Sequence, residues 1–458
     1  MQRRSKRILT GLGIFVVVLA AIYALLLMHA TGELRRAYAA LATEGRPMRT
    51  AEIVPTKIPD AENAAVLYQS AVLMLKGQPA GDKSLHERLT GRSSERLGED
   101  EKRQLIGQET VANALALVEQ GTRRPACQLE HNNGGFLEVP HGPPLDDMRN
   151  LGSVLMARAK FEAGAGRPAK AWDLLLTQLR FADSLRSDPA STTQFTRFVL
   201  ARWTCQTIRW LCETAPPDQE HIRAMEDLLK RQQAIEPLIR AVDGERLLIG
   251  EWFFNLPREE LDKTLWKERE QNKNNITPPG VMKAEHRLSF LILAFKPRLI
   301  ADHAAYLQLM RKRVQLLQGP YRSWREADEF MQTSHWDFLT DKLSRFSGAD
   351  KEFFCRLLAE LRMTRAGLAL LQYQRTHEAF PGTLDALSLE RLIDPYTEEP
   401  LHYRPEGEGF VVYSVGDDRK DNGGTPRPER EDSDPRRKPV EYDMVWRFPT
   451  PENRDKPK

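Results

Sequence analysis

The chain has 458 residues, of which 41% are hydrophobic and 29% charged, and its formal net charge is +3. This apolar content is sufficient for a packed core, and the length suits two or three domains or one extended helical domain. Four of the basic residues lie within the first seven positions, so the remainder carries 3 − 4 = −1. A near-neutral remainder has no electrostatic footprint for nucleic acid, and we expect no nucleic-acid partner.

Residues 8–28 form an uncharged, apolar run of 21 residues that follows this basic stub. A helix needs about 20 apolar residues to cross a bilayer, so we predict a single transmembrane anchor here. Positive residues stay on the cytoplasmic side, which places the N-terminus in the cytoplasm and the bulk of the chain outside it. The alternative is a cleaved signal peptide, but its apolar core is normally about 7–15 residues long, and Met28-His29-Ala30 is a poor cleavage site.

The juxtamembrane region, residues 30–146, combines helical patterns with irregular segments. The anchor helix is expected to continue to about Ala42 and to break at Gly45-Arg46-Pro47. Apolar residues at helical spacing predict helices over 61–76 and 99–120. The glycine-, proline- and charge-rich stretches between and after them read as loops.

Residues 147–379 are almost continuously helical in pattern, with proline and glycine pairs marking the helix ends. Residues 154–186 predict a helical hairpin that resembles one tetratricopeptide-type unit and turns at Gly164–Pro168. No clear copy follows at a fixed period, so we favour an irregular helical array. The apolar run 288–295 is too short to span a membrane. It is either a helix resting on the membrane surface or a buried core helix, and we favour the second interpretation.

Beyond about residue 380 the pattern changes from helical to extended. Residues 401–404 and 410–413 are short strand patterns joined by a turn rich in glycine, and residues 444–448 supply a third strand. The fold class is therefore mainly α with a small C-terminal β-hairpin module. Four parts are predicted: a stub and anchor (1–29), juxtamembrane helices and loops (30–146), an α-helical domain (147–379), and a β module with a disordered insertion and tail (380–458).

Residues 366–424 resemble the C-terminal half of a type II secretion major pseudopilin. The resemblance rests on an ordered series of motifs: Phe380-Pro381, Leu384-Asp385-Ala386-Leu387, Asp394-Pro395, Pro400-Leu401-His402-Tyr403, Tyr413-Ser414-Val415-Gly416-Asp417-Asp418 and Asp421-Asn422-Gly423-Gly424. A similar tail ends many large single-pass bacterial membrane proteins, which the whole chain resembles. The resemblance therefore implies a location in the bacterial inner (cytoplasmic) membrane.

In the pseudopilins the last loop binds calcium, and the resemblance carries this metal site onto Asp418, Asp421 and Asp443. Ca²⁺ takes about six to eight oxygen ligands from carboxylates, carbonyls and water. Two features depart from the family: Arg419 stands where a glycine is usual, and a proline- and charge-rich insertion over 425–439 separates Asp443 from the loop. The alternative interpretation is an acidic, glycine-rich turn without metal.

The front of the chain also departs from the family. A prepilin leader is cut after glycine, and a glutamate follows five residues into the mature helix. After Gly11 and Gly13 the corresponding positions are Val16 and Val18. We therefore expect neither leader cleavage nor assembly into a pilus-like fibre.

The sequence contains no nucleophile elbow, zincin motif, Ser-x-x-Lys motif or phosphate-binding loop. We favour a membrane-anchored extracytoplasmic helical scaffold or interaction protein with a protein partner that the sequence does not identify. The alternative is a cell-envelope enzyme whose site is assembled from distant residues. A deep pocket with convergent histidine and carboxylate groups would favour the enzyme, and shallow grooves would favour the scaffold.

Overall fold

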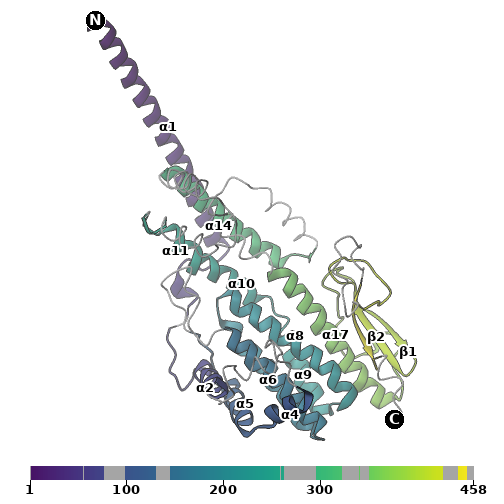
Figure 1. Ribbon diagram of the computed structural model, residues 1–458. Coiled ribbons are helices and arrows are strands. Elements are labelled where there is room, and N and C mark those ends of the chain that lie inside the picture. Colours follow the sequence, from purple (N-terminus) through teal and green to yellow (C-terminus); the bar gives the residue numbers. More distant parts are fainter. Residues whose placement is uncertain are drawn as a thin grey trace.

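The computed structural model describes residues 2–54, 56–76, 98–129, 145–257, 259–261, 295–321, 340, 350–426 and 442–450. Within these ranges the protein is mainly helical, with a small antiparallel sheet near the C-terminus, as the sequence predicts (Figure 1). The apolar run 288–294, the insertion beyond Pro426 and the tail beyond Thr450 lie outside the described residues.

Helix α1 (Gln2–Thr43) extends without interruption from the apolar run into the body of the molecule (Figure 1). Its side chains are exposed from Thr10 to Leu26, and burial begins at Ala30, which is 3% exposed. Among the described residues, α1 is the one helix that is long and apolar enough to cross a membrane. The same helix therefore contains both the predicted anchor and a part of the folded core.

Helix α1 ends where the sequence predicts. Gly45 adopts the left-handed conformation with φ of 67°. The Arg46 N–H donates to the Leu41 carbonyl and the Gly45 N–H to the Ala42 carbonyl, each at 3.0 Å. These two bonds form a Schellman motif, which satisfies the last carbonyl groups of the helix.

The body is built from helices that pack around one large hydrophobic core, and a second, small cluster contains Cys355, Ala359, Tyr396 and Val415. The longer helices are α2 (Ala64–Lys76), α4 (Glu99–Gly107), α5 (Glu109–Thr122), α6 (Leu145–Gly164), α7 (Pro168–Ser184), α8 (Ser191–Thr214), α9 (Gln219–Arg231), α10 (Glu236–Gly244), α14 (Lys296–Gln318) and α17 (Asp350–His377). The shorter elements are η1 (Thr50–Glu52), η2 (Leu185–Ser187), the π-helix η3 (Glu245–Gly250), α11 (Glu251–Phe254) and η4 (Leu384–Ala386). The predicted helix over 99–120 is interrupted at Gln108, whose extended backbone (ψ 146°) separates α4 from α5.

The predicted hairpin over 154–186 is confirmed as α6 and α7. Gly166 takes a positive φ of 73° in the turn, and Pro168 occupies the first turn of α7. Glu162 is fully buried near the end of α6, where Arg158 Nε donates to it at 2.7 Å and Arg167 forms a second ion pair. A buried carboxylate that is paired in this way fixes the geometry of the turn.

The sheet contains β1 (His402–Glu406), β2 (Gly409–Ser414) and β3 (Met444–Phe448) in the order β1-β2-β3, with both pairings antiparallel. It packs on α17 through β2 and β3. Phe410, Val412 and Leu401 are buried. The tightest approach is at Gly367 of α17, where an added Cβ would overlap the Trp446 indole ring.

Candidate functional site

The predicted metal-binding residues lie around one loop that follows β2. Asp443 immediately precedes β3 and is 1% exposed. Its Oδ2 accepts N–H bonds from Gly424 at 2.7 Å and from Asn422 at 3.1 Å. Burial raises the pKa of this carboxyl above its ordinary value, and the backbone N–H donors only partly offset that effect. Asp443 thus closes the loop by accepting bonds from its backbone.

Asp418 and Asp421 lie in the same loop but turn in different directions. Asp418 accepts the Lys420 N–H at 3.0 Å and lies 3.5 Å from the Asn422 side-chain amide. Asp421 accepts the Tyr413 hydroxyl at 2.9 Å and the Gly423 N–H at 2.8 Å. Asn422 therefore connects Asp418 with Asp443, whereas Asp421 is turned toward the face of β2.

The structure does not bring the three carboxylates together as one group. The backbone N–H groups of Asn422 and Gly424 donate to Asp443 Oδ2, and Arg419 follows Asp418 directly. Within the described part of the chain, no group of three or more histidine, cysteine, aspartate or glutamate side chains is placed to hold a metal. Calcium at Asp418, Asp421 and Asp443 stays a prediction from the resemblance.

A second carboxylate of the β module, Asp394, is fully buried. Its Oδ1 accepts the Ser414 hydroxyl at 2.9 Å and the Tyr396 N–H at 3.0 Å, and its Oδ2 accepts the Val415 N–H at 2.9 Å. Asp394 therefore connects the segment before β1 to the end of β2. The sequence indicated it only as part of the Asp394-Pro395 motif of the resemblance.

Another group of buried polar residues lies where α1 enters the body. The Tyr38 hydroxyl on α1 donates to Glu251 Oε2 of α11 at 2.8 Å. His303 of α14 places its Nε2 3.3 Å from the same Glu251 oxygen and stacks on Phe254, with ring centroids 4.4 Å apart. Tyr38, Glu251 and His303, together with the neighbouring Arg46, Asp243 and Arg246, are called the anchor-base cluster below.

The remaining members of the anchor-base cluster are ion pairs. Asp243, at the end of α10, pairs with Arg46 just beyond α1, and its Oδ1 lies 3.4 Å from Arg246 Nη2. Arg246 has a side chain only 1% exposed, and it also donates to the Pro47 carbonyl. These contacts hold the segment after α1 against α10 and η3.

The π-helix η3 brings these charges together. Bulges of this kind are often found at functional sites. Gly250, the last residue of η3, lies so close to Tyr306 that an added Cβ would overlap the phenol ring. The Tyr306 hydroxyl is buried and has no hydrogen-bond partner within the part of the chain that the structure describes. The absence of a Cβ at Gly250 thus lets α14 approach the end of η3 closely.

The electrostatics of the anchor-base cluster favour an ionised Glu251. Burial raises the pKa of Glu251, but the hydrogen bonds from His303 and Tyr38 and the charge of Arg246 outweigh it, so the pKa lies below its ordinary value. Burial and the neighbouring carboxylate raise the pKa of Tyr38. The phenol therefore stays a neutral donor, and the cluster acts as a joint between three helices.

Sequence reasoning missed this cluster. Tyr38 and Glu251 are 213 residues apart, and Tyr38 and His303 are 265 residues apart. Each residue alone is an ordinary polar position on a helix, and no motif spacing connects them. The one local signal is Asp243-Gly244-Glu245-Arg246, a run of charges inside an otherwise apolar helical pattern.

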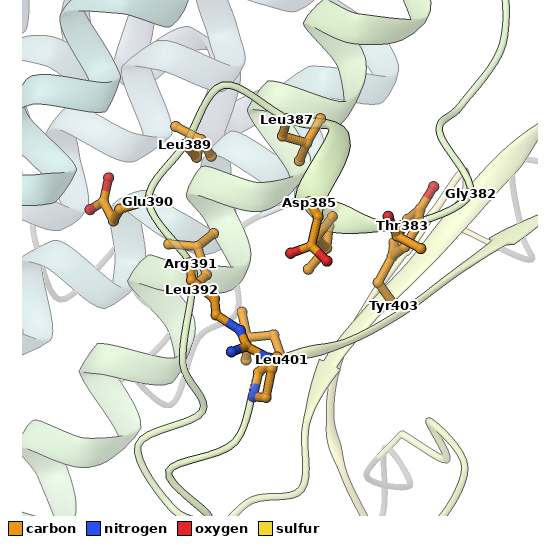
Figure 2. A pocket seen from close by; sticks show the side chains of 12 residues that line it. Gly382, Thr383, Asp385, Leu387, Leu389, Glu390, Arg391, Leu392, Leu401 and Tyr403 are labelled. Carbon is orange, nitrogen blue, oxygen red and sulfur yellow. The ribbon is translucent and has the colours of Figure 1, made fainter.

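A surface pocket of about 380 Å³ is formed by the segment that follows α17 and by the start of β1 (Figure 2). Its lining is Gly382, Thr383, Leu384, Asp385, Leu387, Leu389, Glu390, Arg391, Leu392, Pro400, Leu401 and Tyr403. Figure 2 shows Asp385 and Arg391 on the loop around the pocket, with Tyr403 on the side of the strand. The lining contains the carboxylates of Asp385 and Glu390 and no histidine.

No protein-family model, curated protein or solved structure matches the chain.

Proposed function

We propose that the chain is a membrane-anchored scaffold that holds a helical body in a fixed pose on the extracytoplasmic face of the bacterial inner membrane and presents it to a protein partner. The observation that carries this proposal is the continuity of α1. Its first part is apolar and exposed, and its second part, from Ala30, belongs to the core. An anchor built into the core positions the body far more strictly than a flexible tether does.

The contacts of the second part of α1 support this function. Helix α14 packs along α1 over much of its length. Arg311 of α14 pairs with Glu44 at 2.6 Å, and Tyr38 is held by Glu251. Because these bonds come from separate elements of the body, rotation of α1 against the body would break several of them together.

Reporter fusions test the anchoring and its orientation. We expect a reporter that is active only outside the cytoplasm to be active when fused after Gly45 and after Lys458, and inactive when fused after Arg7. A reporter that fluoresces only in the cytoplasm should give the opposite pattern at all three positions. Cytoplasmic readings after Gly45 or Lys458 would refute the proposed topology.

The membrane span itself is tested by a charge at its centre. Val17 is 68% exposed, so a lysine there meets no steric obstacle from the body. A charged residue at the centre of a transmembrane helix costs about 2.5–3.5 kcal/mol. We expect Val17→Lys to shift part of the protein to the alkaline-extractable fraction, whereas the control Val17→Leu should stay with the membrane. Equal extraction of the two variants would refute a spanning α1.

A further inference from the structure

The start of α14 lies beside the apolar part of α1 (Figure 1). Phe295, the residue that precedes α14, contacts Tyr23 edge-on, with ring centroids 5.7 Å apart and planes at 73°. Tyr23 belongs to the apolar run of α1. Phe295 is 41% exposed and Tyr23 is 40% exposed. An exposed aromatic pair therefore connects the body to the anchor within the anchor's apolar segment.

The position of Phe295 can be measured along α1, because α1 and α14 run parallel. Phe295 contacts Tyr23 near the start of α14, and Arg311 pairs with Glu44 farther along both helices. Tyr23 lies 28 − 23 = 5 residues before Met28, the last residue of the apolar run. At a rise of about 1.5 Å per residue, Tyr23 and its partner lie about 7.5 Å inside the run.

The apolar run is only just long enough to cross the hydrocarbon core of a bilayer. Its 21 residues span about 31 Å as a helix, and the hydrocarbon core of a bilayer is about 30 Å thick. The helix therefore cannot slide far enough to put Tyr23 into water without exposing residues 24–28 on that side and drawing the basic stub into the hydrocarbon from the other side. A depth of about 7.5 Å also falls within the range of about 5–10 Å at which interfacial helices bury their apolar face.

We propose that the start of α14 is a second membrane contact, in which Phe295 lies among the lipid acyl chains of the extracytoplasmic leaflet and Lys296 reaches the phosphate groups. This inference rests on the proposed anchoring by α1. Tyrosine and tryptophan are enriched at membrane–water boundaries, and interfacial helices bury phenylalanine in the lipid. A lysine can extend its amine from there to the headgroups. Lys296 is exposed directly after Phe295, which gives the contact an apolar and a cationic part in succession.

This second contact fixes more than depth. A single helix leaves the body free to tilt with the helix in any direction, and a contact beside the helix axis opposes the tilts that would lift the start of α14 out of the lipid. The end of the body at which α14 begins would then face the membrane. The surface open to a partner would be the side that carries α17 and the sheet.

Depth-dependent fluorescence quenching in phospholipid vesicles tests the inference on the full chain. The native cysteines are all buried, so a polarity-sensitive label can be attached to one introduced cysteine. The test positions are Phe295→Cys and, as a second variant that keeps the aromatic side chain, Lys296→Cys. Leu25→Cys, 65% exposed on α1, reports on anchoring, and Gln308→Cys is an exposed control on α14.

We expect nitroxide quenchers on the acyl chains to quench labels at Leu25 and Phe295 at least about twofold more strongly than the label at Gln308, since interfacial residues lie within reach of the acyl region. Aqueous iodide should quench Gln308 most. The Lys296 label should respond to both quenchers.

The outcomes separate the two proposals. A label at Leu25 that iodide quenches and lipid nitroxides do not would overturn the anchoring, and the second contact with it. A lipid-quenched Leu25 with labels at 295 and 296 that behave like Gln308 would overturn the second contact alone. Labels at 295 and 296 that neither quencher reaches would show that protein covers this surface, either another segment of this chain or a second copy, and would equally overturn the lipid contact.

Discussion

The anchor-base cluster and the C-terminal β module both contain buried carboxylates. The hydrogen-bond donors to these carboxylates differ between the two regions. At the base of α1, Glu251 and Asp243 accept side-chain donors from remote segments, such as the Tyr38 hydroxyl 213 residues away. In the β module, Asp394 and Asp443 accept mainly backbone N–H groups that lie about 20 residues away or less. Side-chain partners fix whole helices against each other, whereas backbone donors close local turns.

This difference predicts that substitutions in the anchor-base cluster lower the stability of the whole fold. Substitutions in the β module should destabilise that module alone. The largest expected effect is for Asp243→Ala. This change leaves Arg246, with a side chain 1% exposed, without its carboxylate partner. Breaking a buried ion pair from one side costs about 3–5 kcal/mol. We expect a loss of this size in denaturant unfolding of the detergent-solubilised protein.

The matched control for Asp243→Ala is Glu52→Ala, because Glu52 pairs with Arg49 on the surface, where the arginine side chain is 85% exposed. Surface pairs contribute about 0–1 kcal/mol. Equal losses for Asp243→Ala and Glu52→Ala would contradict the structural role given to the anchor-base cluster.

Asp394→Ala should give the next largest effect, confined to the β module. The change leaves the buried Val415 N–H and Tyr396 N–H without their acceptor, and unsatisfied groups of this kind cost about 1–3 kcal/mol each. We expect faster hydrogen exchange across β1 and β2 and unchanged exchange in α6–α8. Ser414→Ala, which removes one donor and leaves the carboxylate, should show a smaller effect of the same kind. Acceleration throughout the helical body would contradict a local role.

Gly367→Ala tests how the sheet is seated on α17. Alanine favours a helix by about 1 kcal/mol over glycine, but its methyl group would overlap the Trp446 ring. Overpacking costs about 1–3 kcal/mol, so we expect a net loss of thermal stability. Gly32→Ala in α1, where nothing lies within 4 Å of an added Cβ, should be neutral or stabilising. A stabilised Gly367→Ala variant would show that the sheet does not pack there.

The contribution of Glu251 to the pH dependence of folding stability should be a smaller effect. The pKa of Glu251 is lowered in the folded protein, since the partners named above outweigh its burial. A carboxyl of this kind stabilises the fold above its unfolded pKa, about 4.3, and the contribution is lost as the pH falls through the folded value. We expect Glu251→Gln to lose less stability than the wild type between about pH 6 and pH 3. Parallel curves for the two proteins would contradict this assignment.

Calcium at the C-terminal loop should have the smallest effect on the stability of the whole chain, because it would bind at a single turn. A ligand that binds only the folded state at ten times its Kd adds about 1.4 kcal/mol. If the loop binds calcium as the resemblance implies, calcium raises the melting midpoint of the β module and Asp443→Asn abolishes the rise. Equal midpoints with calcium and with chelator would identify the loop as a hydrogen-bonded acidic turn.

The contrast between local and long-range contacts also explains which features the sequence could predict. The end of α1 at Gly45, the α6–α7 turn at Gly166 and the strands of the hairpin depend on nearby residues, and their patterns predicted them. The split at Gln108, the π-helix η3 and the contact of Gly367 with Trp446 depend on packing between distant segments. The anchor-base cluster belongs to the second kind, since no spacing in the sequence relates Tyr38 to His303.

If α1 spans the bilayer as proposed, its uninterrupted helix couples the position of the body to the tilt of the membrane-spanning part. Thr43 lies 43 − 28 = 15 residues beyond the apolar run, or about 22 Å along the helix axis. A tilt of about 20°, which is average for a transmembrane helix, would carry this point about 8 Å sideways over the membrane surface. Since tilt responds to the match between helix length and bilayer thickness, the reach of the body over its surroundings would change with the thickness of the membrane that holds it.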